Sequence, residues 1–250
     1  MIVVVCGQHR SGSTLTWQVA HELLTSAASM SAPSVSAPSV SAPTVSAPLW
    51  TPREDLQMLA LDPLDVRMVK VHFSPVMKKK DFPQLGARYI YTYRDPRDVA
   101  ASLIRKGRYQ LGHEKRGVEG VTAMIRRELR GDTFWRTRET LWIGRYEELA
   151  QDVPRLVYSL AEFLRVPVDE DSVKRISDFV SVDRQRKRVA DVRDFGVDPS
   201  LRITSNHITD GQEGAWRATL TSDEVAAIEV LAADWMRAHG YVCETLPPQL

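Results

Sequence analysis

Cysteine is scarce in this chain, with two in 250 residues, Cys6 and Cys243 near opposite ends. Two such distant cysteines form neither a disulfide framework nor a metal-binding pair, so we expect a reducing, cytoplasmic compartment and no metal. Neither sign of charge is in excess, since the chain has 33 Lys and Arg residues and 32 Asp and Glu residues, which gives a net charge of +1. We therefore expect no nucleic acid and no membrane as partner, and an anion site must come from local clustering.

The sequence also has no long apolar run. Its N-terminal run, residues 1–6, is too short for a signal peptide, and a membrane span needs roughly 20 apolar residues. The β-branched residues of this run predict a buried parallel strand over residues 2–6. With 43% hydrophobic and 26% charged residues, the chain has the composition of a globular protein, and we expect one domain over residues 1–250.

Residues 31–48 form a low-complexity repeat that reads SAPSVSAPSVSAPTVSAP. Proline at every fifth position excludes a regular helix and a central strand, so the repeat is expected to be extended or mobile. One interpretation is a surface loop lengthened by repetition. The other is a mobile lid or a partner-binding segment near the active site.

Strands and helices alternate through the rest of the chain. Strands are expected over residues 2–6, 66–71, 87–93 and 141–146, and helices from 13, over 53–61, from 96, and over 118–140, 154–165, 169–180 and 222–239. This alternation predicts an α/β fold of three layers, in which a central parallel sheet is flanked by helices on both faces.

A glycine-rich loop, GQHRSGST at residues 7–14, joins the first strand to the first helix. Backbone N–H groups at such a turn point at an anion, and the helix dipole favours negative charge there. The spacing fits the phosphate loop of nucleoside-triphosphate enzymes, except that Ser13 replaces the lysine. Arg10 supplies a cation instead. The loop therefore favours a P-loop-like phosphate site over a plain Gly-Ser turn, and the missing lysine counts against an ATPase or kinase.

A second candidate anion site follows the strand over 87–93. Arg94 comes at the carboxyl end of that strand, the edge at which open α/β sheets bind ligands, and Ser102 lies two turns into the next helix. Asp95 and Pro96 are typical of a helix start. A guanidinium and a hydroxyl together suit a phosphate. The alternative is a well-capped helix beside an exposed arginine.

Both motifs resemble those of the sulfotransferases that use 3′-phosphoadenosine-5′-phosphosulfate (PAPS), of the cytosolic and bacterial small-molecule type. The resemblance rests on RSGSTL at residues 10–15 and on RDPRDVAAS at residues 94–102. It implies that Arg94 and Ser102 bind the 3′-phosphate and that Arg10 contacts the transferring sulfuryl group. It also implies that the 5′-phosphate lies in a cradle formed by Ser11, Gly12, Ser13, Thr14 and Leu15.

A Lys-Val-His triplet at residues 70–72 lies between these two motifs. A lone histidine after a strand is commonly structural. The family, however, carries a K-x-H triplet at this place, and the resemblance implies that His72 is the general base and that Lys70 stabilises the leaving group. A histidine suits this task because it titrates near neutrality.

Two C-terminal segments extend the resemblance. Tyr146, in GRYEEL at 144–149, would approach the adenine, although a core aromatic residue is the alternative. The segment GQEGAWR at 211–217 resembles a loop that closes over the nucleotide, which implicates Gly211, Trp216 and Arg217. Before this loop the family has Arg-Lys, which binds the 3′-phosphate, whereas the chain has Thr209 and Asp210. An aspartate repels phosphate. The cations that could replace the Arg-Lys pair are Arg202, His207 and Arg217.

A basic run at residues 184–188 has two interpretations, a solvated helix face or a contribution to an anion site. Altogether the sequence predicts an enzyme that moves a sulfuryl group from PAPS to a hydroxyl or amine of a small molecule, such as a natural product, and releases adenosine 3′,5′-bisphosphate (PAP). The alternatives are a P-loop nucleoside-triphosphate kinase or related NTPase-like enzyme, and a non-catalytic nucleotide-binding adaptor that uses the repeat to bind partners.

Overall fold

The structure is a computed structural model, and it describes residues 1–30, 45–46, 66–83, 86–105, 117–190, 197–198, 203–204 and 211–247. A five-stranded parallel sheet has the order β2-β3-β1-β4-β5. Its strands are β1 (Ile2–Gly7), β2 (Val45–Ser46), β3 (Val66–Lys70), β4 (Ala87–Tyr93) and β5 (Leu141–Arg145). A separate antiparallel pair joins β6 (Val197–Asp198) and β7 (Ile203–Thr204).

The central position of β1 brings the two predicted anion motifs to one edge of the sheet. The register of β1 and β4 pairs Gly7 with Thr92, so the loop after β1 starts beside the carboxyl end of β4. The N–H of Gln8 donates a hydrogen bond of 3.0 Å to the carbonyl oxygen of Thr92 and extends this pairing into the loop. Arg94 therefore emerges next to the glycine-rich loop.

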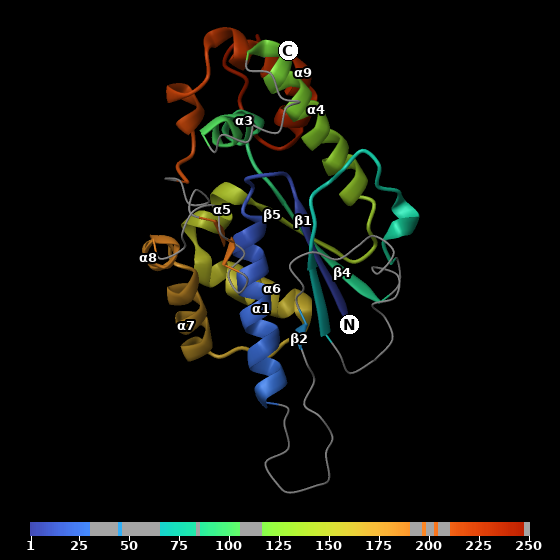
Figure 1. The fold of residues 1–250 in the computed structure, drawn as a ribbon, viewed down its shortest axis with the longest axis vertical. Coiled ribbons are helices and arrows are strands. Elements are labelled where there is room, and N and C mark those ends of the chain that lie inside the picture. The colour runs from blue at the N-terminus through green and yellow to red at the C-terminus, as the bar shows by residue number, and fades with distance from the viewer. Residues whose placement is uncertain are drawn as a thin grey trace, which may run out of the picture.

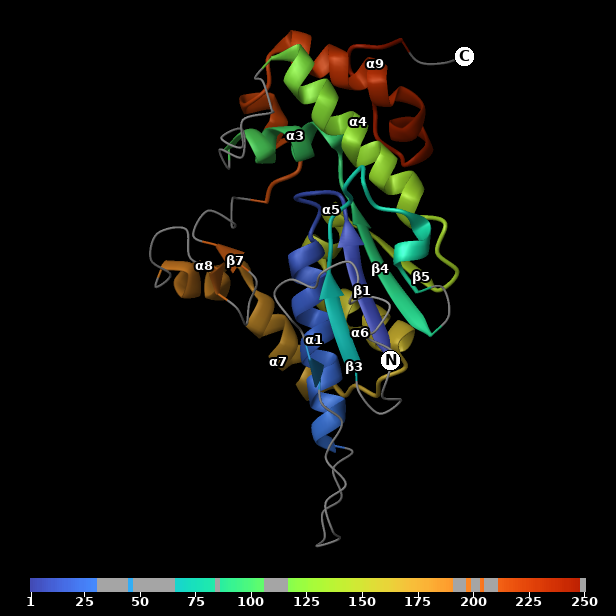
Figure 2. The ribbon, with the colours of Figure 1, turned by 45° about the vertical axis from the view of Figure 1, so that its right-hand side comes forward.

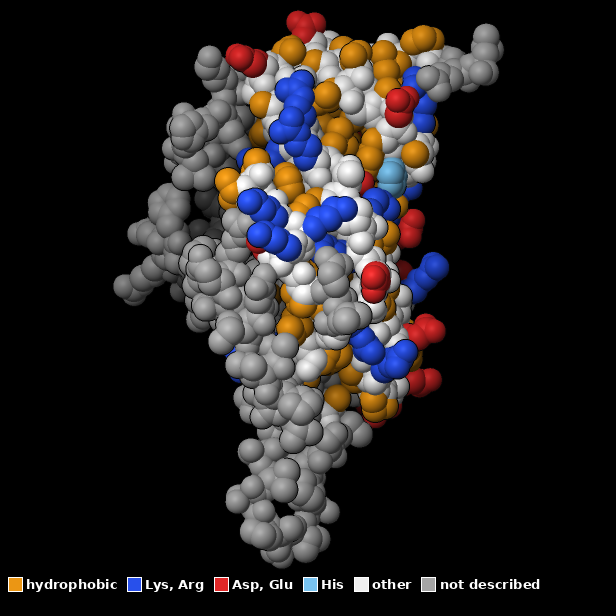
Figure 3. Space-filling model, turned by 90° about the vertical axis from the view of Figure 1, so that its right-hand side faces the viewer, with side chains coloured by type: hydrophobic (Ala, Val, Ile, Leu, Met, Phe, Trp, Pro, Cys, Tyr) orange, Lys and Arg blue, Asp and Glu red, His pale blue; other side chains and the backbone are white. Residues whose placement is uncertain are grey.

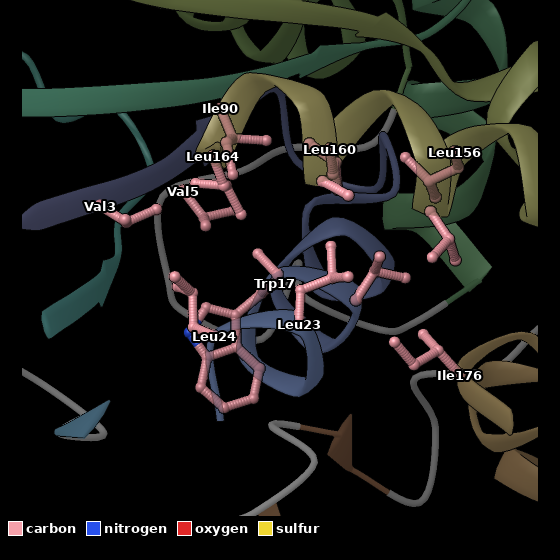
Figure 4. Close-up of a cluster of buried hydrophobic side chains, with 14 of the residues drawn as sticks. Val3, Val5, Trp17, Leu23, Leu24, Ile90, Leu156, Leu160, Leu164 and Ile176 are labelled. Carbon is pink, nitrogen blue, oxygen red and sulfur yellow. The ribbon is translucent and has the colours of Figure 1, made fainter. Parts of the chain in front are cut away.

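The β-branched residues of β1 are buried on both sides of the sheet. Val3 and Val5 face one core, while Ile2, Val4 and Cys6 face another, as the period of two in a strand requires. The first core lies between the sheet and three helices, α1 (Ser13–Met30), α6 (Val153–Leu164) and α7 (Glu170–Val180). Figure 4 shows side chains of β1, β4 and these helices meeting in it.

The other face of the sheet is covered by aromatic side chains. Phe134 and Trp135 come from the end of α4 (Val118–Trp135), and Phe82 follows the short helix η1 (Lys79–Asp81). The predicted three-layer arrangement, with a parallel sheet covered on both faces, is confirmed. The remaining elements are α5 (Tyr146–Gln151), α8 (Val182–Ala190) and η3 (Ala215–Ala218).

A third core lies beyond the carboxyl ends of the strands. There α3 (Pro96–Arg105) packs with α4 and α9 (Ser222–Ala238), as Figures 1 and 2 show. The predicted start of α3 is correct, because the carboxylate of Asp95 accepts a hydrogen bond of 2.8 Å from the N–H of Arg97. Together these helices form a cap above the edge of the sheet that carries the motifs.

The predicted ends of the helix over 118–140 and of the strands over 66–71 and 141–146 are wrong. The helix expected over 118–140 ends at Trp135, because the chain folds back there and places the Arg138 guanidinium over the Phe134 ring, 4.7 Å from its centroid. Tyr146, expected at the end of a strand, is the first residue of α5. Glu147 and Glu148 follow it in the first turn, where negative charge stabilises a helix.

The proline-rich repeat contributes one described element. Residues 45–46 form the edge strand β2, paired with Val66 and Arg67 of β3, which agrees with the exclusion of a central strand. The rest of the repeat, the helix expected over 53–61, and residues Arg202, His207, Thr209 and Asp210 lie outside the described residues.

The described surface carries charge of both signs. On the face shown in Figure 3, Lys and Arg side chains gather near the middle and Asp and Glu side chains lie mainly toward the margin. On α8, Arg184, Arg186 and Lys187 are exposed while Gln185 is buried, which agrees with a solvated helix face for the basic run. Among the described helices, none combines the length and apolar character that crossing a bilayer requires.

The core between α6 and the sheet generates a stability prediction. Leu160 of α6 is fully buried there, so Leu160→Ala should lower the free energy of unfolding by about 2–5 kcal/mol. Glu162→Ala, on the exposed face of the same helix, should change it by less than about 0.5 kcal/mol. Urea-induced unfolding measures both, and equal effects of the two substitutions would contradict this packing.

Candidate active site

The glycine-rich loop is held together by its own buried side chains. The Ser11 hydroxyl lies 2.7 Å from the carbonyl oxygen of Gln8 and 2.8 Å from the hydroxyl of Thr92. Ser11 is fully buried, so its side chain fixes the loop to β4. Ser13 and Thr14, both largely buried, begin α1, whose first N–H groups lack partners within the helix and form a site for an anion.

Arg10 joins the two predicted anion motifs. Its φ angle of 64° is uncommon for a residue with a side chain, and the turn directs the guanidinium toward α3. There Nε donates a hydrogen bond of 2.8 Å to the hydroxyl of Ser102, which is fully buried. Arg10 and Ser102, 92 residues apart in the sequence, thus lie in direct contact.

Arg94 is buried at the centre of the site, with a relative exposure of 2%. Its Nη2 donates to the carbonyl oxygen of Gln212 at 2.9 Å and lies 3.6 Å from the carboxylate of Asp98. Its Nη1 lies 3.5 Å from the carbonyl oxygen of Arg10. Among the described residues, the buried Nε of Arg94 has no hydrogen-bond partner. This donor is therefore available to a ligand oxygen.

Tyr146 lies between the glycine-rich loop and the loop at residues 211–217, which we call the late loop. A Cβ at Gly12 would lie 2.9 Å from the Tyr146 ring, and a Cβ at Gly211 would lie 2.7 Å from its hydroxyl. Both glycines have positive φ angles, 88° and 67°. The Arg94 guanidinium lies over the same ring, 4.3 Å from its centroid. Glycine is needed at both positions because the tyrosine fills the space that a side chain would take.

The late loop is tied to α3 by the carboxylate of Asp98, which lies in the RDPRDVAAS motif. Asp98 accepts hydrogen bonds from the N–H groups of Gly214 at 2.9 Å and Trp216 at 3.0 Å. Burial raises the pKa of Asp98, and the Arg94 guanidinium and these N–H groups act in the opposite direction. Asp98 thus couples the late loop to the segment that carries Arg94.

Trp216 packs on the second anion motif, whereas Arg217 pairs with the C-terminal segment. The Trp216 ring is buried, and the guanidinium carbons of Arg97 and Arg217 lie 4.4 and 4.3 Å from its centroid. Arg217 also forms an ion pair with Glu244, and both side chains are exposed. Trp216 is therefore the buried side chain on which the late loop packs, while Arg217 lies toward the C-terminal segment.

The Lys-Val-His triplet reaches the same loop from β3. Lys70 Nζ donates to the hydroxyl of Thr14 at 2.5 Å, and His72 Nδ1 lies 3.1 Å from the carbonyl oxygen of Gly7. Because a carbonyl oxygen only accepts, Nδ1 carries the proton in this contact, and a neutral His72 ring then keeps an acceptor at Nε2.

Two further residues at this site were missed from the sequence. His9 stacks on His72, and the buried Glu128 of α4 binds His9 at 2.8 Å through both its ring Nδ1 and its backbone N–H. His9 stands inside the glycine-rich motif, so its position was a usable signal. Glu128 lies 119 residues further on in an Arg- and Glu-rich helix, and no local pattern distinguishes it.

The fold and site can be compared with known proteins. The model of the sulfotransferase domain family matches residues 2–240. The chain therefore belongs to the sulfotransferase family, and the family and enzyme class predicted from the sequence are confirmed. Among curated proteins, none matches this chain.

Solved structures of low sequence identity share the fold. Retinol dehydratase in complex with retinol and PAP is 16% identical, with a TM-score of 0.63 over 99% of this chain and 83% of that one. Mouse sulfotransferase SULT7A1 complexed with PAP is 17% identical, with a TM-score of 0.60 over 94% of this chain and 84% of that one. At these identities the likeness establishes the P-loop-like α/β fold.

The anchoring of the late loop by Asp98 can be tested directly. Asp98→Asn replaces one accepting oxygen by an NH2 group, so at least one of the N–H groups of Gly214 and Trp216 loses its partner. We expect amide hydrogen exchange there to become faster by about tenfold or more, since a hydrogen bond to a charged group contributes about 1.5–3 kcal/mol. Asp183→Asn, on the exposed side of α8, is the control, and unchanged exchange in Asp98→Asn would refute the anchor.

Proposed function

We propose that the protein transfers a sulfuryl group from PAPS to a hydroxyl or amine of a small molecule and releases PAP. The observation that carries the proposal is the meeting of Arg10, Arg94 and Ser102 at the carboxyl edge of the sheet. Two guanidinium groups beside a buried hydroxyl suit a ligand with several phosphate or sulfate oxygens.

The residues present fit such a donor. An unsatisfied buried donor such as the Nε of Arg94 costs about 1–3 kcal/mol, and a phosphate oxygen would remove that cost. Arg94 and Ser102 would hold the 3′-phosphate, and the loop at residues 11–15 would hold the 5′-phosphate on the N-terminus of α1. Tyr146 would lie near the adenine, and the loop at 211–217 would close over the nucleotide.

His72 would act as the general base. An acceptor hydroxyl is a poor nucleophile until its proton is removed, and the contact of His72 Nδ1 with Gly7 supports an accepting Nε2 for that proton. As the acceptor oxygen bonds to sulfur, the bond between sulfur and the bridging phosphate oxygen breaks, and PAP carries away the electron pair. An acceptor amine that is already neutral would depend less on His72.

Lys70 and Arg10 would stabilise the leaving group. Transfer of this kind resembles phosphoryl transfer, in which attacking and leaving oxygens lie roughly in line and catalysis depends on positioning and charge. Lys70 of β3 contacts Thr14 of the loop that would hold the bridging oxygen, and Arg10 is itself part of that loop. The donor supplies the activated sulfuryl group, and we propose no role for a metal.

The acceptor is proposed only by class. Retinol dehydratase has been solved with retinol and with androsterone, which supports a small-molecule acceptor here. A natural product as acceptor, a cytoplasmic location and a single domain over residues 1–250 stay predictions from the sequence. A nucleoside-triphosphate kinase is disfavoured because Ser13, and not lysine, begins α1.

The proposal is tested by separating binding from turnover. Arg94→Ala should weaken PAP binding by about 10- to 100-fold, since a hydrogen bond to a charged group contributes about 1.5–3 kcal/mol. His72→Ala should leave PAP binding intact and lower turnover about 10²- to 10⁴-fold. Titration calorimetry measures binding, and transfer of a radiolabelled sulfuryl group to phenol, alcohol and amine probes measures turnover.

Two controls guard against misfolding. Arg94→Lys keeps a cation beside Asp98 and should recover part of the PAP affinity, whereas Arg184→Ala on the exposed face of α8 should change nothing. PAP binding by Arg94→Ala as tight as that of the unaltered protein would refute the assignment of the 3′-phosphate site.

A further inference from the structure

Two histidine rings lie face to face beside the glycine-rich loop. The ring centroids of His9 and His72 are 4.2 Å apart, and the planes differ by 19°. His72 also contacts the carbonyl oxygen of Gly7 through Nδ1 at 3.1 Å. That edge contact alone would still allow the ring plane to tilt through its side-chain torsions. The stacked His9 ring covers a face of His72 and blocks that tilt.

His9 is itself clamped by a single carboxylate. One oxygen of Glu128 lies 2.8 Å from the His9 ring Nδ1, and the other accepts a hydrogen bond of 2.8 Å from the His9 backbone N–H. The Glu128 side chain is 5% exposed, and Arg127 Nη2 lies 3.3 Å from it. A carboxylate that holds both the backbone and the ring fixes His9 against α4.

The charge state of Glu128 supports the clamp. Burial alone would raise the pKa of Glu128, but the attraction of His9, its hydrogen bonds and the nearby Arg127 lower that pKa overall. An ionised carboxylate only accepts hydrogen bonds, so both His9 contacts have a suitable acceptor.

We propose that His9, held by Glu128, is a positioning residue that fixes the imidazole of His72 with Nε2 directed to the acceptor; this inference rests on the proposed function. Gly7 and His9, which hold the edge and the face of His72, both belong to the loop that would bind the 5′-phosphosulfate. The base and the reacting sulfur are therefore set by one rigid segment, and their relative geometry is kept when the acceptor changes.

The test uses variants that separate the stacked ring from the clamp. His9→Asn keeps a side-chain donor for Glu128 but removes the ring, and His9→Phe keeps a ring but removes the donor. Glu128→Gln loosens the clamp and leaves both rings in place. The matched control is His21→Asn on α1, because His21 also stacks on an aromatic ring, that of Trp17 at 5.1 Å, but lies outside the site.

We expect His9→Asn to lower kcat about 10- to 100-fold, with PAP affinity and acceptor KM within about threefold, since a displacement of about 1 Å costs about that much in rate. His9→Phe should recover part of kcat, Glu128→Gln should lie between His9→Asn and the unaltered protein, and His21→Asn should leave turnover unchanged. Nitrogen NMR of the His72 ring in the ligand-free full chain should show one Nδ1–H tautomer in the unaltered protein and a tautomer mixture in His9→Asn.

Failure of this inference differs from failure of the proposed function. If His72→Ala loses turnover while His9→Asn keeps both kcat and the single His72 tautomer, His9 has no positioning role. If His9→Asn loses as much turnover as His72→Ala with the His72 tautomer unchanged, His9 acts directly and positioning is wrong. If His72→Ala keeps full turnover, the assigned base is wrong, and the NMR result alone then decides whether His9 orders the His72 ring. Should His9→Asn unfold, Glu128→Gln and His9→Phe provide the same readouts.

Discussion

The burial of the Arg94 charge is the constraint on which the rest of the site depends. A guanidinium group removed from water is costly unless partners compensate it, and here all the partners but Asp98 come from segments far from Arg94 in the sequence. They are the carbonyl oxygens of Arg10 and Gln212, the carboxylate of Asp98 and the ring of Tyr146. These contacts with Arg94 join the glycine-rich loop, α3, α5 and the late loop in one site.

The glycine-rich loop serves both halves of the proposed chemistry. Arg10 and the start of α1 face the proposed donor, while the Gly7 carbonyl oxygen and the His9 ring hold His72. Since a transfer in line requires the base and the leaving group on opposite sides of sulfur, one segment that sets both positions removes a source of misalignment. Glu128 extends this control to α4, which also packs on the third core.

Much of this arrangement could be predicted from local sequence patterns. The β-branched run of residues 2–6 and the turn chemistry of Asp95 and Pro96 specify strand and helix within a few residues. Contacts between distant residues could not be predicted. Neither the pairing of Glu128 with His9 nor the hydrogen bonds of Asp98 to the late loop leaves a local signature, because both depend on how helices dock on the sheet. The end of α4 at Trp135 was missed for the same reason, since tertiary packing of Arg138 sets it.

Thermal unfolding with and without nucleotide tests the central claim most directly, because a ligand that binds the native state raises the unfolding temperature by mass action. PAP without magnesium should raise the unfolding temperature of the unaltered protein, and ATP with magnesium should raise it less. Because the Nε of Arg94 is a buried donor at the site that has no partner among the described residues, the PAP effect should shrink in Arg94→Ala. Stabilisation by magnesium-ATP alone, or by neither nucleotide, would contradict a PAPS site built around Arg94.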